Sequence, residues 1–234
     1  MATLQFNSYT NFAELTDALV AEWLNAIDEA ISKRLPSSFA LAGGSTPAPV
    51  YRQLDRILST RDTCQIKLIA TDERWVDDSD AQSNEGLFKQ CLPITYGKQW
   101  KLISLKNAAR SPEVAIEAIS DRLSQQIPSS FNAVVLGMGA DGHIASLFPG
   151  APTQHDDLNC LAAVHPQTRQ SRISLSLPRL LQTEKIWLVI TGAEKRKVFE
   201  TAHEAALEPA SNSDLPIATL LREARCNIEV FWCP

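Results

Sequence analysis

Residues 131–143 read FNAVVLGMGADGH, an apolar run that ends in a glycine-rich turn. The run from Phe131 to Leu136 is apolar except for Asn132, which is typical of a strand that is buried on both faces of a parallel sheet. The turn that follows carries three glycines, an aspartate and a histidine. Because open parallel sheets bind ligands at the carboxyl ends of their strands, this stretch predicts both a parallel sheet and a functional site beside it.

The rest of the chain alternates short apolar runs with longer helical patterns. We expect strands at 4–8, 38–42, 65–70, 101–105, 131–136, 171–177, 185–191 and 228–232, and helices at 11–35, directly after Thr46, and at 84–91, 111–126, 193–206 and 217–223. Thr46 is expected to cap the second helix, with Pro47 in its first turn. No Pro/Gly/Ser-rich linker divides the chain. The alternation therefore predicts an α/β fold in which residues 1–234 form a single domain, with a doubly wound, mostly parallel sheet flanked by helices in a Rossmann-like arrangement.

The composition limits the class of partner. The 234-residue chain has a formal net charge of −5 and no basic block, which disfavours nucleic acid or an anionic membrane as a partner. The N-terminus has no signal-peptide pattern, and no apolar run approaches the roughly 20 residues of a membrane span. The five cysteines are an odd number without CxxC spacing, and we expect reduced, buried thiols in a cytoplasmic protein. The sequence leaves open whether the protein is a monomer or a homodimer.

Four segments with unusual residues each follow the carboxyl end of an expected strand. They are 43–47 (GGSTP), 71–75 (TDERW), 137–143 (GMGADGH) and 191–195 (TGAEK). Because the carboxyl ends of parallel strands meet at one edge of a sheet, we expect the four segments to converge on one pocket.

The first of these segments suits a phosphate or sugar hydroxyls. Gly43 and Gly44 let the backbone approach a ligand closely. Ser45 and Thr46 add hydroxyl groups, and the following helix adds its N-terminal N–H groups. The segment lacks the distal lysine of a nucleotide-binding P-loop, so it is not one. The alternative is an ordinary strand-to-helix turn with a capping residue.

The second and fourth segments offer positive charge. Asp72, Glu73 and Arg74 are either solvated loop residues or part of a site in which the arginine clamps a phosphate or carboxylate. In the second case Trp75 would form a wall of the site. Lys195 lies in the first turn of an expected helix, where a cation is unfavourable unless an anion compensates it. The alternative for this lysine is a solvated surface side chain.

The third segment places His143, one of four histidines, two residues after Asp141. A histidine at a glycine-rich strand end is a candidate for general acid–base catalysis. Residues 137–142 also satisfy the GxGxxG pattern of dinucleotide-binding sites. Two features argue against a dinucleotide site. Pro149 and Gly150 would end the following helix within about two turns, and the acidic residue that such a site places near the ribose is missing. The scattered histidines show no zinc-ligand spacing, so we expect no metal.

Several segments together resemble the signature segments of 6-phosphogluconolactonases. They are 41–47 (LAGGSTP), 71–76 (TDERWV), 83–84 (SN), 137–149 (GMGADGHIASLFP), 172–177 (RISLSL), 192–195 (GAEK) and 215–216 (LP). Their order and spacing also match, and the resemblance covers nearly the whole chain. The segment 137–149 is the most specific of them.

Glucosamine-6-phosphate deaminases belong to the same superfamily and are the main alternative. They share a GSTP-like loop and a DGHIA segment, but their pattern continues with Phe-Asn-Glu-Pro, and that glutamate partners the histidine in sugar-ring opening. Here Phe148 stands at the glutamate position and cannot transfer a proton. Smaller departures are Ala42 where serine is usual, Asp77 and Asp78 near an expected proline, and Glu85 where an aromatic residue is common. None of them removes a group that the chemistry needs.

The resemblance implies hydrolysis of 6-phospho-D-glucono-1,5-lactone to 6-phospho-D-gluconate in the oxidative pentose phosphate pathway, without a cofactor. His143 would be the general base, and Asp141 would orient its imidazole or hold a sugar hydroxyl. Arg74 and Lys195 are the first candidates to hold the phosphate, followed by Arg172. The partner would then be a small phosphorylated sugar lactone.

The expected binding set is larger than these charged groups. It comprises Gly43, Gly44, Ser45, Thr46, Asp72, Arg74, Asn84, Gly139, Arg172 and Lys195. Backbone N–H groups near residues 43–45 or Gly139 would stabilise the oxyanion. A non-catalytic sugar-phosphate sensor would keep Arg74 and Lys195 but would not need His143, and the presence of both sets favours an enzyme.

Overall fold

The computed structural model describes residues 3–35, 37–61, 65–154, 157–208 and 213–234. Within them, seven strands form a parallel sheet in the order β1-β10-β9-β6-β2-β3-β5. These strands are β1 (Leu4–Ser8), β2 (Ser37–Leu41), β3 (Ile66–Ala70), β5 (Trp100–Leu102), β6 (Ala133–Gly137), β9 (Lys185–Thr191) and β10 (Asn227–Cys233). The sheet confirms the expected α/β, mostly parallel fold.

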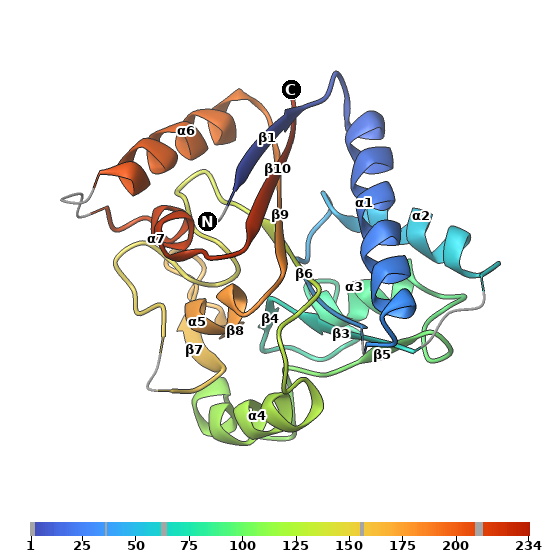
Figure 1. The fold of residues 1–234 in the computed structure, drawn as a ribbon. Coiled ribbons are helices and arrows are strands. Elements are labelled where there is room, and N and C mark those ends of the chain that lie inside the picture. The colour runs from blue at the N-terminus through green and yellow to red at the C-terminus, as the bar shows by residue number, and fades with distance from the viewer. Residues whose placement is uncertain (1–2, 36, 62–64, 155–156, 209–212) are drawn as a thin grey trace.

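Helices lie on both sides of this sheet, with α1 and α2 on the opposite side from α6 and α7 in Figure 1. The helices are α1 (Phe12–Ser32), α2 (Ala48–Leu58), α3 (Asn84–Cys91), α4 (Pro112–Gln126), α5 (Leu177–Leu181), α6 (Ala193–Leu207) and α7 (Pro216–Glu223). None of the helices in the described part of the chain is both long and apolar enough to span a membrane.

The order of the strands places a topological switch between β2 and β6. From β2 the chain proceeds through β3 to β5 at one edge, whereas β6 pairs on the other side of β2 and leads through β9 to β10. Connections that leave the sheet in opposite directions open a crevice at the carboxyl ends of the two strands at the switch. The segments 43–47 and 137–143 follow these two strands, so the topology brings them to the crevice.

A second, antiparallel sheet was not expected from the sequence. It consists of β4 (Asp72–Arg74), β8 (Ser171–Leu175) and β7 (Cys160–Val164), in the order β4-β8-β7. The three charged residues of β4 have no apolar periodicity, which is why a loop was the natural expectation. The predicted strand at 171–177 ends at Leu175, and Leu177 begins the short helix α5.

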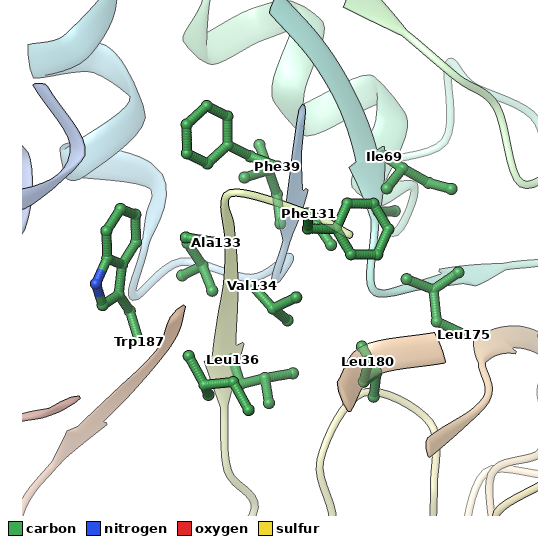
Figure 2. Close-up of a cluster of buried hydrophobic side chains, with 14 of the residues drawn as sticks. Phe39, Ile69, Phe131, Ala133, Val134, Leu136, Leu175, Leu180 and Trp187 are labelled. Atoms are coloured by element: carbon green, nitrogen blue, oxygen red, sulfur yellow. The ribbon is translucent and has the colours of Figure 1, made fainter. Parts of the chain in front are cut away.

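The core confirms that β6 is buried on both faces. Residues 133–136 are each 0% exposed. Figure 2 shows this strand running between Trp187 on one side and Leu175 and Leu180 on the other. Full burial stabilises the fold by roughly 1.5–3 kcal/mol for each of the larger side chains, Val134, Val135 and Leu136. This rigid central strand fixes the place where the 137–143 turn begins.

The expected cap of the second helix is wrong. Helix α2 begins at Ala48, and Pro47 occupies the N-cap position without a side-chain hydrogen bond. Gly44 has φ of +96°, a left-handed conformation that favours glycine, and it turns the chain before the helix starts. As a result Thr46 lies one position too early to cap and lines the crevice instead.

The described cysteines form no disulfides. Cys91, Cys160 and Cys233 are buried and Cys226 is half-buried, all with free thiols. Cys64 lies outside the described residues. No group of three or more metal-ligating side chains gathers within the described ranges.

Candidate active site

A pocket of about 310 Å³ opens at the carboxyl ends of β2, β3, β6 and β9. All four of the expected segments contribute to its lining. Of the twelve residues singled out from the sequence, eleven line it: Gly43, Gly44, Ser45, Thr46, Asp72, Arg74, Asn84, Gly139, His143, Arg172 and Lys195. The twelfth, Asp141, contacts His143.

His143 is held by the turn after β6. Its Nδ1 lies 2.6 Å from Oδ1 of Asp141, and its backbone N–H donates to the same oxygen at 3.2 Å. The backbone N–H of Gly139 donates to the carbonyl of His143 at 2.9 Å, which closes the turn. Because Asp141 occupies Nδ1, Nε2 remains available to a ligand or to water.

Gly139 is required by this arrangement. A Cβ on residue 139 would lie 2.2 Å from Nδ1 of His143 and 2.4 Å from Oδ1 of Asp141. Both distances are far below van der Waals contact. The absence of a side chain therefore lets the imidazole and the carboxylate pack over the backbone.

The electrostatics of the pair favour an ionised carboxylate. Burial raises the pKa of Asp141, but the charge of His143 and the hydrogen bonds from it outweigh that effect, so the pKa lies below its usual value. A negative Asp141 beside Nδ1 favours the tautomer in which Nδ1 carries the proton. The pair can therefore accept a proton at Nε2.

Phe148 forms the other support of the imidazole. It is 4% exposed, and its ring centroid lies 5.1 Å from that of His143. The ring of His165 also contacts Phe148, edge-on, with the two ring centroids 5.3 Å apart. The side chain of residue 148 that contacts the imidazole of His143 thus carries no titratable group.

Two arginines face each other across the small sheet. Arg74 of β4 and Arg172 of β8 are direct register partners. Asp72 lies close to this pair and accepts hydrogen bonds from Arg172 at 3.5 Å and from the Ser146 hydroxyl at 2.6 Å. Burial, reinforced by the positive charge of Arg74, lowers the pKa of Arg172, while Asp72 opposes the shift. Like charges directly opposite are unfavourable, and an anion between them would relieve the repulsion.

The buried carboxylate of Glu73 fixes Arg74 and Asn84 in place. Glu73 is 0% exposed. It accepts four hydrogen bonds, from the backbone N–H groups of Arg74, Asn84 and Glu85 and from the Ser83 hydroxyl. Lys106 approaches it to 3.6 Å and also pairs with Asp78 at 2.6 Å. Glu73 therefore ties β4 to the N-terminus of α3, and it is not a solvated loop residue.

Asn84 packs against the backbone of the first segment. Its Nδ2 donates to the carbonyl of Asp72 at 2.7 Å. A Cβ at residue 43 would lie 1.8 Å from its Oδ1, so Gly43 is the only residue type that fits there. This contact joins the loop after β2 to the strand that carries Arg74.

Lys195 reaches the pocket from the first turn of α6. The N-cap of this helix is Gly192, with φ of +83°. The Nε1 of Trp232 donates to the carbonyl of Gly192 at 2.9 Å, which anchors the turn to β10. The position of Lys195 is therefore set by the end of the neighbouring strand.

One expectation about an individual residue needs revision, and one residue that contacts the pocket lining was missed. Trp75 is not among the residues that line the pocket. Its backbone N–H continues the pairing with Ser171 at 2.9 Å, and its side chain packs against the core. Ser146 was missed, although it donates to Asp72 and lies 3.3 Å from Arg172. Its place in the most specific signature segment was the available signal.

The pocket is positively charged overall. Arg74, Arg172 and Lys195 line it together with His143, and Asp72 is the only acidic residue in the described lining. Such a lining suits a small ligand that carries a phosphate. His143 and the three cationic side chains thus line the same pocket.

Comparison with known proteins agrees with this chemistry. The family described as glucosamine-6-phosphate isomerases/6-phosphogluconolactonase matches residues 10–232. The chain belongs to this family. A 6-phosphogluconolactonase of Caulobacter vibrioides is 30% identical to this chain, and the match covers 98% of this chain and 97% of the relative. A 6-phosphogluconolactonase of Mesorhizobium japonicum is 31% identical, and the match covers 100% of this chain and 97% of that relative. The crystal structure of a 6-phosphogluconolactonase from Shewanella baltica superposes with a TM-score of 0.86 at 28% identity, over 100% of this chain and 98% of that one.

Proposed function

We propose that the protein hydrolyses 6-phospho-D-glucono-1,5-lactone to 6-phospho-D-gluconate, the reaction for which its relatives are named. The observation that carries the proposal is the His143–Asp141 pair on the wall of a pocket with three cationic side chains. The cations suit the phosphate, and the imidazole suits activation of water. The reaction belongs to the oxidative pentose phosphate pathway, and we place the protein in the cytoplasm as a monomer or homodimer.

In the proposed mechanism, water attacks the lactone carbonyl carbon while Nε2 of His143 takes its proton. Asp141 stabilises the imidazolium that forms. The tetrahedral intermediate then collapses, the bond from the carbonyl carbon to the ring oxygen breaks, and the imidazolium returns the proton to that oxygen. A lactone is an activated ester, so the scheme needs no covalent nucleophile, metal or cofactor.

The remaining pocket residues bind and orient the substrate. Arg74, Lys195 and Arg172 hold the phosphate by charge-assisted hydrogen bonds. Backbone N–H groups of the 43–45 turn or of Gly139 stabilise the negative oxygen of the intermediate. Because these groups are fixed by the sheet, little reorganisation is required during the reaction.

A deaminase of the same family is disfavoured by the contact between Phe148 and His143. Sugar-ring opening in the deaminases uses a glutamate at that position. Here the residue that contacts the imidazole is an aromatic ring, and Asp72 is the only carboxylate in the described lining. A non-catalytic sensor would have no use for an imidazole held with Nε2 free.

The first test is hydrolysis of freshly prepared 6-phosphogluconolactone, followed through the product with 6-phosphogluconate dehydrogenase and corrected for spontaneous opening. We expect turnover well above the blank for wild type, and a loss of about 10²-fold or more for His143→Ala. His203→Ala is the matched control, because His203 lies in α6, is not among the described residues that line the pocket, and stacks on Phe199.

No rate above the blank for wild type would overturn the proposal. Ammonia release from glucosamine 6-phosphate would then identify a deaminase. Binding of 6-phosphogluconate without turnover, unaffected by His143→Ala, would identify a sensor.

A further inference from the structure

The pocket that would hold the lactone in the proposed reaction is here called the catalytic pocket. A second pocket, also of about 310 Å³, lies beside it, and the proposed reaction places no ligand there. We call it the outer pocket, and it is lined by Gly44, Ser45, Ala48, Arg52, Arg74, Ala81, Gln82, Ser83, Asn84 and Leu87. Gly44, Ser45, Arg74 and Asn84 line both pockets. A ligand bound in one pocket is therefore next to a ligand bound in the other.

The charged side chains in the described lining of the outer pocket are all positive. Arg52 and Arg74 are the only charged side chains in its described lining, and no carboxylate accompanies them. Arg52 is exposed and forms no ion pair with another described residue. Two arginines without a counterion make a pocket that attracts anions.

Arg74 lies between the two pockets and has N–H groups that are not used in hydrogen bonds with other described residues. Its Nη1 donates a hydrogen bond to the carbonyl of Gln82 at 2.6 Å. Its Nη2 donates to no other described residue and is not among the buried atoms that lack a partner. A guanidinium carries five N–H donors in a planar fork. Arg74 can therefore contact anions in both pockets at once, whereas Arg52 reaches only the outer one.

The backbone adds to the positive potential. Helix α2 begins at Ala48, which lines the outer pocket, and the N-terminus of a helix presents free N–H groups and the positive end of its dipole. Ser45, also in the lining, is exposed and offers a hydroxyl. These are the donor types that hold a phosphate group.

We propose that the outer pocket is a second anion subsite, in which Arg52 and Arg74 hold a phosphate-sized dianion while another ligand occupies the catalytic pocket. The site goes beyond the proposed reaction, because the lactone carries one phosphoryl group and the catalytic pocket already has cations for it. The anion is either free phosphate or a second phosphoryl group on the same sugar. Both share the chemistry of a phosphate dianion.

The test is calorimetric titration of inorganic phosphate into the free protein at constant ionic strength. We expect two sites in wild type. Arg52→Ala should weaken the outer site by about 10-fold or more, and Lys195→Ala, which lines only the catalytic pocket, should weaken the other. Arg56→Ala is the matched control, because Arg56 is an exposed arginine one turn further along α2 that lines neither pocket.

A second experiment distinguishes the two sources of the anion. Fructose 1,6-bisphosphate and fructose 6-phosphate are titrated separately into wild type and Arg52→Ala. Tighter binding of the bisphosphate by about 10-fold in wild type, abolished in Arg52→Ala, assigns the outer site to a second phosphoryl group on one sugar. Equal affinities together with two phosphate sites assign it to free phosphate.

A single phosphate site in wild type, with the same bisphosphate preference in wild type and Arg52→Ala, would overturn the proposal. Equal losses in Arg52→Ala and Arg56→Ala would also overturn it, because they would show a general effect of surface charge. These measurements need no turnover. Failure of the anion subsite is therefore distinguishable from failure of the lactonase proposal.

Discussion

Replacing Gly139 with alanine tests the geometry of the His143–Asp141 pair, the proposed general base and its partner, separately from the stability of the fold. The new Cβ would lie 2.2 Å from Nδ1 of His143 and 2.4 Å from Oδ1 of Asp141. To restore contact, the imidazole must move by about 1 Å or more. The 2.6 Å hydrogen bond between the two side chains cannot survive such a shift without rearrangement.

The expected effect on the reaction follows from that displacement. Misplacing a catalytic group by about 1 Å costs on the order of 10²-fold in rate, so we expect kcat of Gly139→Ala to fall by about that factor. Arg74 and Lys195, the proposed phosphate ligands, come from β4 and α6, so KM should change by less than about 3-fold. The melting temperature should stay within about 3 °C of wild type, because the atoms that clash belong to side chains at the rim of the pocket.

Gly137→Ala provides the comparison. A Cβ at residue 137 meets no atom within 4 Å, although the residue lines the same pocket. We expect its kcat to fall by less than about 5-fold. The assay is lactone hydrolysis corrected for spontaneous opening. Equal kcat values for Gly139→Ala and wild type, in a folded protein, would refute the idea that the pair must be packed over residue 139.

Two further predictions concern the buried charges behind β4. Lys106→Met removes the ion pair of the fully buried Glu73, and we expect the free energy of unfolding, measured with urea, to fall by about 3 kcal/mol. Lys89→Met is the control, because its salt bridge to Asp78 is exposed, and its loss should be less than about 0.5 kcal/mol. Equal losses would contradict this. Burial raises the pKa of Glu85, so the folded state binds the carboxyl proton more tightly than the unfolded state does. The free energy of unfolding of wild type therefore rises as the pH falls through the folded-state pKa, and it stops rising below the unfolded-state pKa. Glu85→Gln should therefore be more stable than wild type at pH 8, and urea titrations should show that advantage vanishing by about pH 4.

The sequence predicts the pocket because of a general property of parallel sheets. The four segments with glycines, hydroxyls and charges follow β2, β3, β6 and β9, which are neighbours in the sheet. Their carboxyl ends meet at one edge whatever the details of the loops. Eleven of the twelve selected residues therefore line one cavity, although their roles in the reaction remain predictions.

The buried charges could not be predicted in the same way. Glu73 lies in a polar stretch that reads as a loop, and its burial depends on donors at residues 83–85 and on Lys106, which are distant in sequence. The pairing of Arg74 with Arg172 likewise joins residues almost a hundred positions apart. Local periodicity carries no information about such contacts, because tertiary packing decides them.

Local conflicts in this protein gather around the catalytic pocket. Arg74 faces Arg172 across two strands, and Lys195 lies at the positive end of a helix. Each arrangement is electrostatically unfavourable by itself, and both lie at the same cavity. A dianion placed there would relieve both, because it neutralises the arginine pair and satisfies the helix end. Charge arrangements that are unfavourable by themselves, but that one ligand could neutralise together, are expected at a binding site rather than in a structural core. A phosphorylated ligand is therefore what the proposed function predicts for these charges, and the His143–Asp141 pair at the same pocket is its proposed proton acceptor.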